Sequence, residues 1–113
     1  MILEKNYDNL SDDLFISFPE FTSIFEAYEG NYLIFSDFYD YLINNLHNRQ
    51  MMIKIGNFIS SYLNIQDKEI TNLIVIELFH PIYGEEYKEK IILKFINEDA
   101  KKMFLKYKNL FFN

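Results

Sequence analysis

The most hydrophobic part of the chain runs from Asn72 to Phe79, where six of eight residues are apolar. On a helical wheel these side chains fall on every side, which is typical of a helix buried in the middle of a domain. Three of them are β-branched, so a buried strand is the alternative. Asp67 is a good N-cap residue and Pro81 stops a helix, which leaves about thirteen residues without a break. That length favours a central helix over residues 67–79.

Apolar residues recur at helical spacing over the rest of the chain as well. The predicted helices are joined by only a few residues, so neighbouring helices should lie antiparallel. We therefore expect one all-α domain over residues 1–113, with six or seven short antiparallel helices stacked as hairpins around the central one. Besides 67–79, the predicted helices are residues 3–16, with a break allowed near Ser11, and residues 17–30, 36–46, 50–63, 85–95 and 97–111.

The helix predicted over residues 17–30 starts at a capping box. Ser17 can accept a hydrogen bond from the amide of Glu20, whose side chain can reach back, and Pro19 suits the first helical turn. Gly30 tolerates the left-handed conformation that ends a helix. The apolar stripe of this helix is Phe21, Ile24, Phe25 and Tyr28.

Single residues inside the other helices also carry information. Ser36 or Asp37 can cap the third helix. Gly56 lies inside the fourth, where glycine is unfavourable, which indicates a close helix crossing. Glu77 is the charge expected nearest the core, so it needs a partner such as a lysine, Arg49 or a tyrosine hydroxyl.

Composition limits the classes of protein that remain. The chain has no cysteine, which excludes disulfides, thiolate metal sites and a cysteine nucleophile. Its longest apolar runs are about four residues, too short to span a bilayer, and residues 1–8 lack the pattern of a secretory signal. We therefore expect a cytoplasmic protein without a membrane partner. Residue types with AT-rich codons abound, which indicates an AT-rich bacterium or its phage.

Charge is unevenly distributed along the chain, whose net charge is −6. Residues 1–40 contain nine acids and one lysine, residues 41–80 are balanced, and the remainder carries seven lysines and five acids. An acidic surface repels nucleic acid and attracts basic proteins, and tyrosines beside acids suit a protein interface. Solubility alone would also explain the acids. The predicted partner-binding residues are Glu26, Glu29, Tyr32, Asp37, Tyr39, Asp40 and Tyr41.

The lysines of the last helix raise the alternative of nucleic-acid binding. The aromatic residues beside them follow the buried stripe, so a core with a solvated face explains the pattern better. We therefore expect no direct contact with nucleic acid. The residues concerned are Lys101, Lys102, Lys106 and Lys108, with Tyr107, Phe111 and Phe112 as candidate stacking side chains.

Catalytic and metal-binding patterns are weak in this sequence. Glu77 and His80 have the Glu-x-x-His spacing of di-iron bundles, but that chemistry needs a second such pair and further carboxylates. Acid–base catalysis would require carboxylates in a pocket, and pairs three residues apart occur in most acidic helices. We expect no cofactor and no metal. The enzyme alternative rests on Glu77 with His80, or on the pairs Asp37 with Asp40 and Glu26 with Glu29.

The chain resembles a group of short helical bacterial proteins over roughly residues 18–105. Members of this group have a "PEF" helix, then a "GD[FL]" helix, and a central "VQNLI" helix with an acidic start. They look like toxin-immunity or related uncharacterised defence proteins without known catalytic residues, so the resemblance implies a binding protein. The chain departs from the pattern at Ser36, where glycine is usual, and at His80. The matching segments are Phe18–Phe21, Ile34–Phe38 and Asp67–Phe79.

Charge and resemblance together predict a small inhibitor that binds a basic protein. The leading interpretation is an immunity-type protein that neutralises a toxin, such as a nuclease, by occlusion. A phage-encoded inhibitor of a bacterial defence nuclease, similar to an anti-CRISPR protein, would need the same features. Both interpretations stay open on the sequence.

Overall fold

The computed structural model describes residues 3–111, and every regular element in this range is a helix. The predicted all-α fold class is therefore confirmed. The elements are α1 (Leu10–Ser17), the 3₁₀ turn η1 (Ala27–Glu29), α2 (Asn31–Asn44), α3 (Arg49–Leu63), α4 (Lys68–Ile74), the π-helical turn η2 (Val75–Phe79), α5 (Glu86–Phe95) and α6 (Glu98–Phe111).

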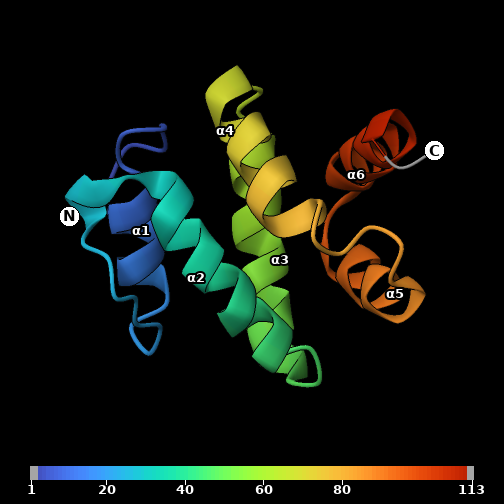
Figure 1. Cartoon of the computed structure of the whole chain (residues 1–113), viewed down its shortest axis with the longest axis horizontal. Helices are drawn as coiled ribbons and strands as arrows, with labels where there is room; N and C mark the ends of the chain where they lie inside the picture. Colours follow the sequence, from blue (N-terminus) through green and yellow to red (C-terminus); the bar gives the residue numbers. More distant parts are fainter. Residues whose placement is uncertain (1–2, 112–113) are drawn as a thin grey trace.

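Three elements form the middle of the molecule, namely α2, α3 and the continuous segment α4–η2 (Figure 1). α2 and α3 are antiparallel neighbours in the chain, and α4–η2 contacts both. α1 packs on α2 at one end, while α5 and α6 pack on α3 at the other. The segment predicted to be central thus shares that position with α3.

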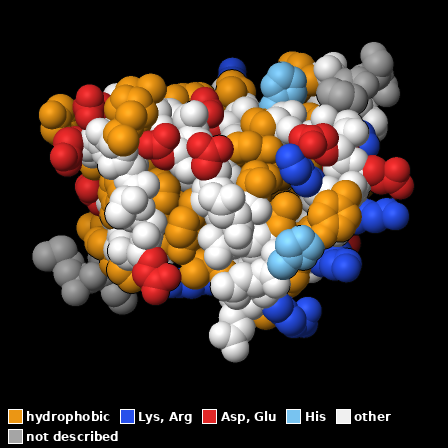
Figure 2. Space-filling view, turned by 60° about the horizontal axis from the view of Figure 1, so that its bottom comes forward, with side chains coloured by type: hydrophobic (Ala, Val, Ile, Leu, Met, Phe, Trp, Pro, Cys, Tyr) orange, Lys and Arg blue, Asp and Glu red, His pale blue; other side chains and the backbone are white. Residues whose placement is uncertain are grey.

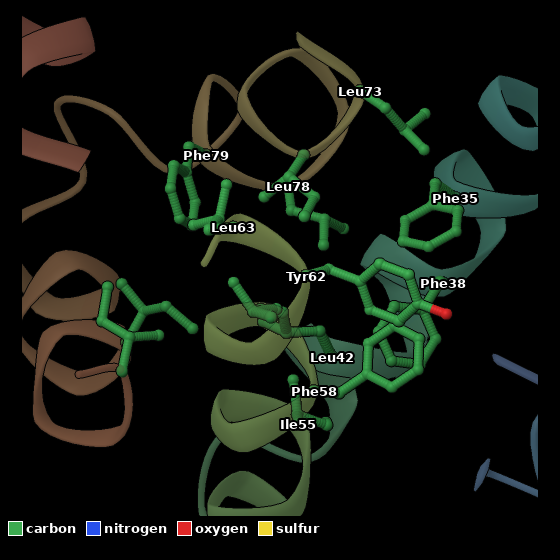
Figure 3. Close-up of a cluster of buried hydrophobic side chains, with 14 of the residues drawn as sticks. Phe35, Phe38, Leu42, Ile55, Phe58, Tyr62, Leu63, Leu73, Leu78 and Phe79 are labelled. Atoms are coloured by element: carbon green, nitrogen blue, oxygen red, sulfur yellow. The ribbon is translucent and has the colours of Figure 1, made fainter. Parts of the chain in front are cut away.

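Side chains from these three elements meet in one hydrophobic core (Figure 3). Tyr62 is fully buried there, and its hydroxyl donates a 2.5 Å hydrogen bond to Oδ2 of Asp13 on α1. Burial and this hydrogen bond raise the pKa of Tyr62 above its ordinary range. The side chains labelled in Figure 3 are Phe35, Phe38, Leu42, Ile55, Phe58, Tyr62, Leu63, Leu73, Leu78 and Phe79.

The helices of the second half lie close to their predicted bounds, and three of them begin at a side-chain N-cap. Asn48 accepts a hydrogen bond from the amide of Met51, and Asp67 accepts one from the amide of Ile70. Asn97 accepts the amide of Ala100 in the same way. Three N-caps therefore fix the starts of α3, α4 and α6.

The central segment differs from the prediction in two respects. It is not covered on every side, since Ile76 is 50% exposed. Its second half is also a π turn, in which the amide of His80 donates to the carbonyl of Val75 at 2.7 Å. Pro81 gives a physical reason, because a proline ring clashes with the carbonyl four residues earlier in an α-helix. The wider turn before Pro81 changes the position of that carbonyl, which belongs to Glu77.

The prediction of a helix over residues 17–30 is wrong. α1 ends at Ser17, and the chain that follows is irregular up to η1. Ser17 does not cap a following helix, because its hydroxyl donates back to Asp13 at 3.1 Å. The Phe18 and Phe21 rings both contact Phe38 of α2, which holds this irregular segment against the core.

α2 begins at Asn31, so the prediction that Ser36 or Asp37 caps this helix is wrong. Gly30 has a φ of +116°; it ends the short turn η1 and also lies directly before the first residue of α2. Asn31 is buried, accepts a hydrogen bond from the Ser11 hydroxyl and donates one to the carbonyl of Tyr7 at 2.8 Å. Asn31 therefore ties the start of α2 to α1 and to the segment before it.

Gly56 lies at the crossing of α3 with α5, as the sequence predicts. A Cβ atom at this position would lie 1.9 Å from the carbonyl oxygen of Phe95 and 2.9 Å from its Cβ atom. No rotation of a side chain relieves a clash with backbone, so the two helices would have to move apart.

Replacing Gly56 by alanine should therefore lower the free energy of unfolding by about 3 kcal/mol, despite alanine's better helix propensity. Urea denaturation followed by circular dichroism measures the change. Asn57→Ala on the exposed side of α3 is the matched control and should leave stability within about 0.5 kcal/mol. Equal stability of the two variants would contradict the close crossing.

The carboxylate nearest the core is Glu89 and not Glu77, which corrects the prediction. Glu89 is 8% exposed, and its two oxygens accept the amide of Gly84 and the ammonium of Lys108, each at 2.7 Å. Glu77 is half-buried and forms no hydrogen bond or ion pair with residues 3–111. Burial raises the pKa of Glu77 because it disfavours the charged form.

A raised pKa means that folded protein holds the Glu77 proton more tightly than the unfolded chain. Glu77 therefore has no effect on the free energy of unfolding well below the ordinary carboxyl pKa. It lowers that free energy as pH rises through the folded-state pKa. Glu77→Gln should raise the melting temperature more at about pH 7 than at about pH 4. Thermal unfolding at both values tests this, with Glu20→Gln as the exposed control. A gain of equal size at both values would contradict it.

Candidate functional site

The predicted partner-binding residues lie on η1 and α2, in the acidic half of the molecule. Figure 2 shows acidic side chains with hydrophobic ones between them at the end that carries the N-terminus, whereas lysines gather at the opposite end. The separation of acidic from basic residues along the sequence thus reappears as a separation across this face. Glu29 lies in η1, Glu26 is the N-cap residue just before it, and α2 carries Tyr32, Asp37, Tyr39, Asp40 and Tyr41.

Tyr32 and Tyr39 lie on the flank of α2 that faces the second half of the chain. Burial raises the pKa of the Tyr32 hydroxyl, and Tyr7, Glu77 and Glu69 add to this effect. Burial also raises the pKa of Tyr39, against the opposing effect of Lys88, which hydrogen-bonds its side chain. The charged groups that act on these two tyrosines therefore include residues of α4, η2 and α5.

Tyr41 lies on the opposite flank and is part of an aromatic cluster. Its ring lies 5.7 Å from that of Phe38, 5.5 Å from that of Phe21 and 6.3 Å from that of Phe18. Its hydroxyl donates to the sulfur of Met51 at 3.7 Å. Tyr41 is therefore largely committed to packing within the protein.

Asp37 also has an internal role. Its Oδ2 atom accepts the Ser23 hydroxyl at 2.5 Å and the backbone amide of Ile24 at 3.3 Å. The Ser23 hydroxyl in turn accepts the amide of Phe25 at 3.1 Å. Asp40, three residues further along α2, is exposed. Asp37 thus positions the chain before η1, while Asp40 is free to meet a partner.

Residues 19–30, which we call the acidic loop, contain the two most exposed large hydrophobic side chains of the described part of the chain. Ile24 is 86% exposed and Tyr28 is 87% exposed. Glu20, Glu26 and Glu29 lie in the same loop and are exposed as well. The loop has defined hydrogen bonds of its own, since the Glu26 amide donates to Oε2 of Glu29 at 2.7 Å.

Ile24 and Tyr28 were not among the predicted site residues, because their spacing placed both on the buried stripe of a predicted helix. Thr22 and Ser23 were the available signal for a turn at this point, because their side chains hydrogen-bond nearby backbone groups and favour turns over helix interiors. The structure buries Phe21 and partly buries Phe25, and turns the other two residues of that stripe outward.

The residues of the enzyme alternative do not converge. An apolar hollow of about 170 Å³ lies beside His80 and is lined by Val75, Ile76, His80 and Phe111, without Glu77. Glu26 and Glu29 form a local hydrogen bond, and Asp37 is bonded to the acidic loop. Over residues 3–111 no three acidic or histidine side chains are grouped so that they could hold a metal ion.

Two of the four lysines of α6 are paired with acids, since Lys101 and Lys108 form ion pairs with Glu98 and Glu89. Of the aromatic residues proposed to stack on bases, Tyr107 and Phe111 lie 6.1 Å apart with stacked rings, and Phe112 lies outside the described residues. Within residues 3–111 no helix is long and apolar enough to cross a membrane.

Comparisons with known proteins give no match to a protein-family model, to a curated protein or to a solved structure. The resemblance to toxin-immunity proteins therefore stays a prediction.

Replacing Asp37 by alanine should loosen the acidic loop, because Ser23 and Ile24 lose their acceptor. We expect a loss of about 1–2 kcal/mol in the free energy of unfolding. We also expect faster hydrogen exchange at the Ile24 amide, measured by NMR. Asp40→Ala on the same helix is the control and should change neither quantity. Unchanged exchange at Ile24 in Asp37→Ala would show that Asp37 does not hold the loop.

Proposed function

We propose that this protein is a small acidic inhibitor of the immunity type, which acts in the cytoplasm and binds a basic toxin. The observation that carries the proposal is the acidic loop, where Ile24 and Tyr28 project almost fully into solvent among exposed glutamates. Such side chains are typical anchors of a protein interface, and tyrosine is enriched among the residues that dominate binding energy.

Occlusion of a partner requires a surface with a defined shape, and the acidic loop meets this requirement. Asp37 holds the loop at Ser23 and Ile24, and the Phe18 and Phe21 rings fix its N-terminal end on Phe38. A loop fixed in this way loses little conformational entropy on binding.

The charge around the loop supports a basic partner. Over the first 40 residues nine acids oppose one lysine, and that lysine, Lys5, is already paired with Asp13 at 3.4 Å. Complementary charge speeds association and makes it sensitive to salt. A toxic nuclease has the basic surface that this requires, because it must bind phosphate backbones.

Affinity capture from the native host, followed by mass spectrometry, identifies the partner. Coexpression with the captured protein then tests inhibition directly. A captured protein that is toxic alone and harmless when coexpressed would support the proposal. A partner with an acidic surface, or one whose activity is unchanged, would contradict it.

The anchors can be tested by binding measurements on the captured partner. Tyr28→Ala and Ile24→Ala should each weaken binding about 30-fold, the effect of removing an interface hot spot of about 2 kcal/mol. Neither should lower the melting temperature, because both side chains are exposed. Leu110→Ala, which removes a side chain 64% exposed at the opposite end of the chain, should leave binding unchanged. Equal effects of all three variants would remove the acidic loop from the interface.

A further inference from the structure

A second hollow lies where the N-terminal segment and the end of α1 meet α3. Its volume is about 250 Å³. Phe18 and Phe58 contribute aromatic surface to it, and Lys5 and Lys54 contribute its charge. We propose that this hollow binds a phosphate group, either free or carried by a small organic ligand. Its lining residues are Lys5, Ser17, Phe18, Lys54, Asn57, Phe58 and Ser61.

Aromatic rings position both lysines at the hollow. The Lys5 ammonium lies 4.7 Å from the centre of the Tyr62 ring and 5.9 Å from that of Phe58. The Lys54 ammonium lies 4.9 Å from the centre of the Phe18 ring. Such cation–π contacts restrict a long side chain without neutralising its charge. The rings therefore hold two positive charges next to one concave surface.

The two lysines differ in how far their charge is compensated. Lys5 pairs with Asp13 at 3.4 Å, whereas Lys54 forms no ion pair with residues 3–111. Asp13 is itself engaged by the Tyr62 and Ser17 hydroxyls. The charge of Asp13 therefore offsets that of Lys5, and the charge of Lys54 is the one left uncompensated. The hollow thus retains positive charge in a half of the protein that is otherwise acidic.

Hydrogen-bonding groups at the hollow complement this charge. The Asn57 amide forms no side-chain hydrogen bond within residues 3–111, so its donors are free for a ligand. The hydroxyls of Ser17 and Ser61 line the wall and donate to Asp13 and to the carbonyl of Phe58. Two ammonium groups and an amide match a doubly charged oxyanion better than a carboxylate with one charge. This match is the reason for proposing phosphate.

An NMR titration of the whole protein with inorganic phosphate tests the proposal, with sodium chloride at equal ionic strength as the reference. We expect saturable shifts of the amides of Phe18, Asn57 and Ser61. Acetate should bind more weakly than phosphate. A second titration with phenyl phosphate distinguishes free phosphate from a phosphate carried by an organic ligand. If phenyl phosphate binds more tightly than inorganic phosphate, the ligand also uses the aromatic surface.

Lys54→Gln should weaken phosphate binding about fivefold, as expected for one partly screened charge. Lys106→Gln is the matched control, because the Lys106 ammonium also lies over a ring, 5.5 Å from the centre of Tyr107, but Lys106 does not line this hollow. The spectrum of each variant reports whether it is folded. Linear shifts, acetate binding equal to that of phosphate, or equal affinity of Lys54→Gln and the unchanged protein would overturn the proposal.

Discussion

The packing of two phenylalanine rings on Phe38 is the constraint on which the N-terminal half of the structure depends. The Phe18 and Phe21 rings each lie 5.2 Å from the ring of Phe38, and both side chains are almost fully buried. They belong to the chain that leaves α1, while Phe38 lies in the middle of α2. Aromatic pairs of this kind contribute about 0.5–1.5 kcal/mol beyond the area they bury. They hold an irregular segment in place where hydrogen bonds of a helix are missing.

This constraint explains which helices the sequence could predict. α3, α4, α5 and α6 depend on local signals, namely apolar spacing and side-chain N-caps such as Asn48, Asp67 and Asn97, and these can be recognised without knowledge of the fold. Residues 17–30 also carry local signals for a helix, namely a possible capping box and an apolar stripe, although Thr22 and Ser23 favour a turn. Contacts with α2, far away in sequence, override those signals.

The candidate site was predictable in part for the same reason. Charge is additive along the chain, so the acidic half could be located, and Glu26, Glu29 and Asp40 lie exposed there. The direction of a side chain in an irregular loop depends on tertiary contacts instead. Hence Ile24 and Tyr28 were assigned to the core, and Asp37 and Tyr41 to the surface, although Asp37 and Tyr41 hold the loop and pack beside it.

The two halves of the chain differ in how many of their charged side chains form ion pairs. Most ion pairs of the described residues lie in the second half, where Lys88, Lys90, Lys101 and Lys108 each pair with a glutamate. The first half has the pair between Lys5 and Asp13. Compensated charges contribute little to long-range attraction, whereas the unpaired acids around the acidic loop add to one another. The surplus of acid is therefore concentrated where the hydrophobic anchors project.

An exposed isoleucine and tyrosine would be a liability on many surfaces, because hydrophobic patches and strand edges promote aggregation. Here the acidic loop lacks strand geometry, and its like charges repel a second copy of the same surface. An approaching surface of positive charge is attracted instead of repelled. The arrangement thus disfavours self-association while keeping Ile24 and Tyr28 available to a basic partner, which is the selectivity that the proposed inhibitor needs.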